Sequence, residues 1–448
     1  MKRWGRRLAV ALLAALAALG SAGCQENRLE QSRSEINDMA LVLAVGVDYQ
    51  EEGGQFRLTV ISQSTSGGSS EEAGSAKAVV SSSSGRTVAE AVSRMTQFSD
   101  SDLFFGHTEY VLLGEDVFNG RLLQVLDVFV RDIQFRLDNT LMVVRGQTAE
   151  ALIRDSQQQE VFLTDRLDNL TNTIGLRSAT RNVRLTESLY QLQNPHDVLL
   201  LPYVAAITDT LPEEEAGEGG SSEQGSGGEG GSSQGGSEEG GSQGGSSGES
   251  SGGSGGPSSQ GESQSQSSSQ PLFLGGYAVV DDKSFLGYLD EKTALGVNWF
   301  TGKINSTVQV VEDDKGYPIS LTITQANVQY DSIHGEDGPV IIVHIRVRSN
   351  ISEIYGELDI YDNSDIELIE ATQSRLISDQ IQRAVDYARE NRLDLLGYNE
   401  ILYHQLNDHW PELSERWEEV LQQTTVRTDI TCQIVGTYQF GNPQRRVE

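Results

Sequence analysis

The order of apolar and polar residues predicts strands and helices on both sides of one long polar stretch. Met39–Val47 is almost continuously apolar, which is typical of a buried strand. Phe56–Ser62 alternates between apolar and polar residues, and the glycine-containing turn before it predicts that the two segments form a hairpin. Glu109–Leu113 and Asn139–Val144 are short, mostly apolar runs that indicate two further strands.

Two helices are predicted between these strands. Thr87 can cap a helix that runs through Met95, and Glu90, three residues after Thr87, completes a capping box. A second helix over Arg121–Val130 places four apolar residues on one face: Leu122, Val125, Leu126 and Phe129. The order strand, strand, helix, strand, helix, strand predicts a sheet with helices packed against it.

The C-terminal part of the chain has the same mixed character. A second capping box, Ser364 with Glu367, predicts a long helix that ends near Arg392, and shorter helices are expected over Asn399–Leu406 and from Pro411 onward. Six segments are expected to be strands: Gly276–Val280, Phe285–Leu289, Ile319–Tyr330, Val340–Ser349, Ile351–Ile360 and Val426–Ile434. The predicted fold class is α+β, with two mixed sheet-and-helix regions.

Residues 212–270 separate these two regions and contain only Gly, Ser, Glu and Gln apart from one Ala and two Pro. Such a segment has no apolar surface to bury, so it is predicted to be a disordered, acidic, Gly/Ser-rich linker. The expected organisation is a signal peptide over 1–23, an N-terminal domain over 24–211, the linker over 212–270 and a C-terminal domain over 271–448. A flexible junction of this kind is not expected to align the two walls of a ligand cleft.

The first 24 residues predict export and membrane anchoring. Basic residues open the chain, an apolar run from Leu8 to Leu19 follows, and the small residues Ser21-Ala22-Gly23 precede Cys24. The apolar run is too short for a comfortable membrane span, so cleavage before a lipidated Cys24 is expected. Two acyl chains on that cysteine would hold the protein on a membrane. The alternative is an ordinary secretory signal in which Cys24 is an incidental thiol.

Composition restricts partners and disulfides. The formal net charge is −32, which disfavours nucleic acid as a partner and makes an anionic lipid surface repulsive without an anchor. The chain has two cysteines, so once Cys24 is acylated Cys432 has no intramolecular partner. Cys432 is expected to be a small core residue in a strand.

No catalytic or metal-binding motif stands out, so the chain is expected to be non-enzymatic, without catalytic residues, cofactor or metal. The sequence lacks a G-x-S-x-G elbow, a phosphate loop and a G-x-G-x-x-G turn in the required context. No pair of histidines has metal-ligand spacing beside a glutamate, and the nearest pair, His404 and His409, is five residues apart. Trp299, Trp410 and Trp417 are expected to be core or interface anchors. A binding or assembly protein is the class that remains.

Several segments, taken in order, resemble the Ger(x)C family, the lipoprotein C subunits of bacterial spore germinant receptors. In the N-terminal region these are Glu35–Ala40 with Leu43–Asp48, Phe105–His107 with Val111–Glu115, and Arg131-Asp132 with Arg136. In the C-terminal region they are Gly276–Val279, Leu286–Leu289, Gly296–Lys303, Asp394–Tyr398, and His409–Pro411 with Trp417. Together they form the signature segments of the chain.

The resemblance implies a non-enzymatic subunit of a nutrient germinant receptor. Its Cys24 would carry fatty acyl chains such as palmitate and hold it on the outer face of the spore inner membrane. Its partners would be the integral membrane A and B subunits, and its lobes would help to assemble or gate the receptor while those partners mainly bind the nutrient. Two other functions stay open: a solute-binding lipoprotein of a membrane transporter, and a tethered cell-wall hydrolase.

Overall fold

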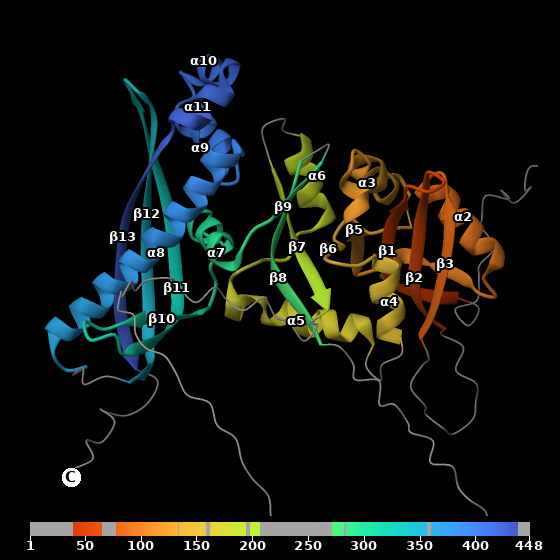
Figure 1. Cartoon of the computed structure of the whole chain (residues 1–448), viewed down its shortest axis with the longest axis horizontal. Coiled ribbons are helices and arrows are strands. Elements are labelled where there is room, and N and C mark those ends of the chain that lie inside the picture. Colours follow the sequence, from red (N-terminus) through yellow and green to blue (C-terminus); the bar gives the residue numbers. More distant parts are fainter. Residues whose placement is uncertain are drawn as a thin grey trace, which may run out of the picture. The chain divides into compact units, whose positions relative to one another are not determined.

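The computed structural model describes residues 39–64, 78–132, 134–157, 162–193, 198–206, 271–281, 284–355 and 360–437. The predicted signal peptide, Cys24 and the predicted linker lie outside these ranges. The described residues on both sides of 207–270 belong to one compact unit with two sheets, shown in Figure 1. The predicted fold class, α+β with mixed sheets, is confirmed.

The larger sheet has nine strands in the order β3-β2-β1-β5-β6-β7-β8-β9, with β4 beside the start of β1. Strands β1, β5, β6 and β7 are mutually parallel, β4 is parallel to β1, and the other neighbours are antiparallel. The strands are β1 (Met39–Gln50), β2 (Gln55–Ser64), β3 (Ala78–Gly85), β4 (Asp102–Phe104), β5 (Tyr110–Gly114), β6 (Thr140–Val144), β7 (Leu199–Ala206), β8 (Leu272–Val280) and β9 (Phe285–Tyr288).

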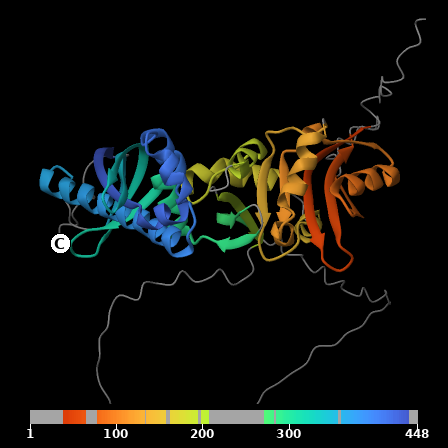
Figure 2. The ribbon, with the colours of Figure 1, turned by 90° about the horizontal axis from the view of Figure 1, so that it is seen from above.

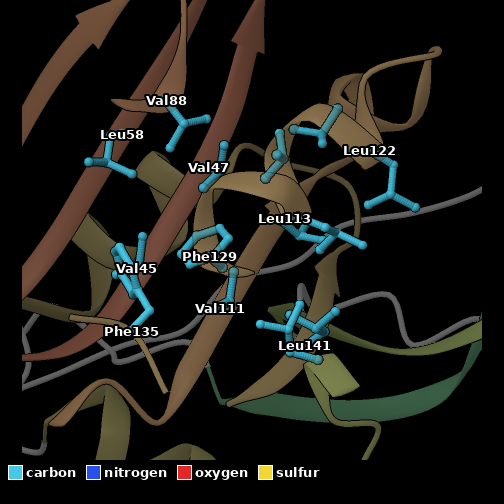
Figure 3. Packing of buried hydrophobic residues seen from close by; sticks show 14 of the residues in the cluster. Val45, Val47, Leu58, Val88, Val111, Leu113, Leu122, Phe129, Phe135 and Leu141 are labelled. Carbon is cyan, nitrogen blue, oxygen red and sulfur yellow. The ribbon is translucent and has the colours of Figure 1, made fainter. Parts of the chain in front are cut away.

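Helices cover both faces of this sheet. One core joins the strands to α2 (Val88–Phe98), α3 (Leu122–Arg131), α6 (Leu185–Gln193) and the short turns η2 (Phe105–His107) and η3 (Glu115–Phe118). Figure 3 shows part of this core, where Val45 and Val47 of β1 lie near Phe129 of α3. A second core on the other face joins the strands to α4 (Ala149–Gln157) and α5 (Leu163–Arg177). Because both faces are buried, central strands such as β5 are apolar throughout.

The smaller sheet has the order β10-β11-β12-β13, with β12 and β13 parallel and the other pairs antiparallel. Its strands are β10 (Val308–Glu312), β11 (Pro318–Gly335), β12 (Gly338–Ile354) and β13 (Thr425–Thr437). The long helix α8 (Asn363–Asn391) runs along one face, as Figures 1 and 2 show. The remaining helices are α7 (Glu291–Phe300), α9 (Tyr398–Gln405), α10 (Trp410–Glu415) and α11 (Trp417–Gln423).

One core cluster joins the smaller sheet and its helices to the larger sheet. Val198, Leu200, Tyr277 and Val279 at β7 and β8 belong to the same buried cluster as Trp299 of α7 and the inner face of α8. The side chain of Trp299 is fully buried, and Trp417 is 6% exposed. Both tryptophans are therefore core anchors, as predicted. Cys432 is also buried, in β13, which confirms its predicted role.

Many of the predicted elements are confirmed close to their predicted bounds. The Thr87 side chain caps α2 by accepting from the backbone N–H of Glu90. The Glu90 carboxylate reaches back to the N–H of Arg86, one residue earlier than a standard capping box. The four residues predicted to face inward on α3 are all buried: Leu122, Val125, Leu126 and Phe129.

Two sequence-based predictions are wrong. The start of the predicted strand Ile351–Ile360 is not a separate strand, because β12 continues unbroken to Ile354, while residues 356–359 lie outside the described residues. Ser364 does not cap the long helix; Asp362 does, and its carboxylate accepts from the N–H of Ser364. Asp290 likewise caps α7, a helix that the sequence analysis does not predict, by accepting from the N–H of Thr293. In both helices the cap is an aspartate directly before the first helical residue.

The strand pairing also changes what the predicted linker connects. β7, which ends at Ala206, pairs with β8, which begins at Leu272, and these two residues are direct partners in the antiparallel register. The described residues on the two sides of 207–270 are therefore held together in one sheet. The expectation that this junction cannot align two walls of a cleft is wrong for that reason. The predicted domain boundaries themselves stay predictions.

Candidate functional site

Cys24, the one residue predicted to carry a modification, lies outside the described residues. Within the part of the chain that the structure describes, no helix is long and apolar enough to cross a membrane. The same part contains no group of three or more His, Cys, Asp or Glu side chains that could hold a metal ion. The signature segments are mostly described, and they are the natural place to look for a site.

The first signature segment fixes α4 against β1. Asp48 is buried, and its carboxylate accepts from the backbone N–H groups of Ala149 at 2.7 Å and Glu150 at 2.8 Å. Burial raises the pKa of this carboxyl, although the two N–H donors oppose the rise. Gly46 allows the close approach, since a Cβ there would lie 2.7 Å from Cδ1 of Ile153. This part of the signature is structural.

The second signature segment joins the middle of the sheet to its edge. A Cβ on Gly114 would overlap with the carboxylate of Asp48, so this position must be glycine. Glu115 next to it accepts from the hydroxyl of Tyr288 at 2.5 Å and from the N–H of Gly146 at 3.2 Å. Burial and the Glu115 carboxylate raise the pKa of Tyr288. Glu115 thus links β5 to β9, which lies beyond the predicted linker in sequence.

The basic signature residues of the N-terminal region are exposed and form local pairs. Arg131 bonds Asp127 at 2.7 Å, and Arg136 bonds Asp138 at 2.6 Å. His107 is exposed at the end of η2, with its ring 5.7 Å from that of Phe104. The geometry gives these residues no catalytic arrangement.

Two signature segments of the C-terminal region shape helix packing. Gly296 lies where α7 crosses α8, and a Cβ there would overlap with the carbonyl oxygen of Gln380. Asp394 caps α9 by accepting from the N–H groups of Tyr398 at 2.7 Å and Asn399 at 2.9 Å. Gly397 between them has φ of 71°, the left-handed conformation that favours glycine.

A pocket of about 510 Å³ lies where three of the signature segments meet. Tyr277 comes from the segment Gly276–Val279, and Asn298 and Lys303 come from the segment Gly296–Lys303. The turn at Asp394–Gly397 belongs to the segment Asp394–Tyr398. Residues from α6, β7, β11 and α9 complete the lining. The volume is within the range of small-molecule sites, which is about 300–1,000 Å³.

The floor of the pocket is polar and fully buried. The Tyr277 hydroxyl donates to Oδ1 of Asn298 at 2.7 Å, and Nδ2 of Asn298 donates to the carbonyl oxygen of Ser178 at 2.7 Å. Tyr277 and Asn298 are each 1% exposed. Burial raises the pKa of Tyr277 to about 12, so its hydroxyl stays protonated at neutral pH. The floor is thus a fixed set of neutral hydrogen-bonding groups.

The walls of the pocket carry charges of both signs. Arg181 and Glu187 form an ion pair at 2.5 Å, which leaves this pair close to neutral. Lys303 and Glu400 also line the pocket, and neither has an ion-pair partner among the residues that the structure describes. The sequence analysis missed this pocket because its residues are spread from Arg181 to Gln405, and only the folded chain brings them together.

The histidines that the structure describes do not form a second site. His344 lies between Asp429 at 2.8 Å and Asp331 at 3.2 Å on the exposed face of the smaller sheet, and the carboxylates raise its pKa. His334 stacks on His409 with ring centroids 4.4 Å apart. His404 lines the pocket but is exposed.

Comparison with known proteins identifies both halves of the chain. Residues 32–206 match the family model described as spore germination protein N-terminal domain, and residues 275–438 match the model described as spore germination B3/GerAC like, C-terminal. Spore germination protein KC of Bacillus subtilis is 21% identical and spans 98% of both chains. Spore germination protein B3 of the same organism is 20% identical over 90% of this chain and 92% of that protein.

A solved structure supports the fold. The crystal structure of the GerBC protein aligns with a TM-score of 0.50 and 16% identity, and the alignment covers 87% of this chain and 96% of that one. The two family models, matched in order on the two sides of 207–270, together cover most of the described residues. The chain is therefore a member of the GerAC-like, or Ger(x)C, family of spore germination proteins.

Proposed function

We propose that this chain is the non-enzymatic, lipid-anchored C subunit of a receptor that triggers spore germination in response to small nutrients. The observation that carries the proposal is the ordered match of both spore germination family models. The full-length similarity to spore germination proteins KC and B3 supports it. In this role the chain helps to assemble the receptor or to transmit its signal, and it catalyses no reaction.

The N-terminal sequence supports the membrane anchor. A basic start, an apolar run and small residues before Cys24 are the pattern of a cleaved lipoprotein signal. A thioether-linked diacylglycerol on Cys24 would place the folded part on the outer face of the spore inner membrane. The net charge of −32 gives the protein no attraction of its own for an anionic bilayer, so the acyl chains supply the attachment.

The partners in this proposal are the integral membrane A and B subunits of the receptor. The compact arrangement of the two sheets suits such a role, because one buried cluster holds residues from both. A contact that a partner makes with one sheet can therefore alter the packing of the other sheet. The alternative, a solute-binding lipoprotein of a transporter, is not favoured, because both matched family models describe spore germination proteins.

Deleting the gene tests the proposed function. Spores of the deletion strain are expected to lose germination with at least one nutrient in a panel of amino acids and sugars, measured as loss of refractility over time. Complementation with the intact gene should restore that response, while the spores keep their normal number and heat resistance. Unchanged germination with every nutrient would contradict the proposal.

A further inference from the structure

We propose that the pocket at Tyr277, Asn298, Lys303 and Glu400 binds a small zwitterion, a molecule that carries one ammonium and one carboxylate group. Lys303 faces the carboxylate, Glu400 faces the ammonium, and the buried floor holds the polar atoms between them. This inference deepens the proposed function, since it gives the receptor subunit a ligand site of its own.

The argument begins with the two unpaired charges. Lys303 has no ion-pair partner among the described residues, and it shares one pocket with Glu400, which has none among them either. Opposite charges on the walls of one concave site favour a ligand that presents the complementary pair.

The floor argues for a ligand with hydrogen-bonding groups and against a purely apolar one. Tyr277 and Asn298 are each 1% exposed, and their hydrogen bonds to one another and to Ser178 fix their orientation. The second Nδ2 proton of Asn298 is not used in these contacts. Polar groups that are already fixed in place bind a ligand with less loss of entropy.

Neighbouring side chains hold the wall that carries Glu400. Tyr330 donates its hydroxyl to the carbonyl oxygen of Phe300 at 2.6 Å, and Gln405 of α9 donates to the carbonyl oxygen of Tyr330 at 2.6 Å. These bonds tie β11 to both α7 and α9, so Lys303, which follows α7, and Glu400 of α9 are held by one connected set of elements. The two charged residues are therefore carried by backbone segments that are held together, which restricts how far apart their side chains can lie.

Calorimetric titration of the full lipoprotein in detergent tests this inference. Glycine, L-valine and L-glutamine are the probes, and N-acetyl-L-valine and L-valinamide are the matched compounds with one charge removed. At least one zwitterion is expected to bind, with a Kd below about 1 mM, which corresponds to about −4 kcal/mol. Each blocked compound should bind at least tenfold more weakly than L-valine.

Variants locate the binding. Lys303→Gln and Glu400→Gln are expected to weaken zwitterion binding about tenfold each, and both residues are exposed, so the fold should be unaffected. Lys292→Gln on α7 and Glu418→Gln on α11, which lie outside the pocket, are the matched controls and should bind as the unaltered protein does. Hydrogen exchange should also show slower exchange at 394–405 when the ligand is bound.

Three results would overturn the inference: no zwitterion binds with a Kd below about 1 mM, the blocked compounds bind equally well, or the pocket variants behave like their controls. Binding is measured on the purified protein, so it is independent of spore behaviour. If zwitterions bind while deletion spores germinate normally, the proposed function fails and the pocket assignment stands. If deletion spores lose a response while nothing binds, the reverse holds.

Discussion

Gly296→Ala is expected to destabilise the protein by about 3 kcal/mol, because it forces α7 away from α8. The new Cβ would overlap with the carbonyl oxygen of Gln380 and lie 3.0 Å from Cβ of Ala384. Neither neighbour is the far end of a flexible side chain. The loss is expected although alanine has a helix propensity about 1 kcal/mol better than glycine. Urea unfolding of the purified chain measures it as a lower midpoint.

Gly436→Ala is the matched control for this substitution. Its added Cβ would have Asn350 Oδ1 at 3.6 Å as its nearest neighbour, which is an ordinary contact. The control should unfold within about 0.5 kcal/mol of the unaltered protein. A Gly296→Ala protein that is equally stable would show that the two helices do not pack as closely as described.

Asp48→Ala is the second large effect, with an expected loss of about 3 kcal/mol. It leaves the N–H groups of Ala149 and Glu150 without an acceptor at the start of α4, and each unsatisfied buried group costs about 1–3 kcal/mol. Asp100→Ala, at an exposed aspartate, is the control and should change stability little. An Asp48→Ala midpoint equal to that of the control would contradict the capping role.

The pH dependence gives an independent check on Asp48. Its pKa in the folded protein is raised above the ordinary 3.8, so the folded state holds this proton more tightly than the unfolded chain does. Stability therefore falls as pH rises from the ordinary pKa to the raised one, and is level above it. The Asn side chain in Asp48→Asn does not ionise. The stability of the unaltered protein relative to Asp48→Asn should therefore fall as pH rises over that range. Urea midpoints measured from acidic to neutral pH show the trend.

Local signals made part of the fold predictable from sequence. The apolar stripe of α3 and the Thr87 cap of α2 depend on residues within a few positions of one another, and both are confirmed. The strand β3 was not predicted, because its run Ser81–Ser84 has no apolar alternation. Contacts distant in sequence hold it instead: Ser82 bonds Thr59 at 3.1 Å, and Ser83 donates to the carbonyl oxygen of Ala91 at 2.6 Å.

The candidate site could not be found by local reasoning. Ala206 pairs with Leu272, which lies beyond the predicted linker in sequence. No local pattern in β7 or β8 specifies the other strand as its partner. The pocket depends on that pairing, because Tyr277 of β8 must meet Asn298 of α7 and Ser178 after α5. What the sequence did supply was the signature segments, three of which meet at the pocket. Their physical roles became clear only from Asp48, Gly114, Gly296 and Asp394 in the folded chain.

The central claim is that a lipid on Cys24 holds a folded, non-enzymatic receptor subunit at the spore membrane. The most direct test is a deletion strain complemented with Cys24→Ala, compared with one complemented by the intact gene. The account predicts that the variant protein is lost from the spore inner membrane fraction and that nutrient germination falls to the level of the deletion strain. A Cys24→Ala protein that remains in the membrane fraction and supports full germination would contradict it.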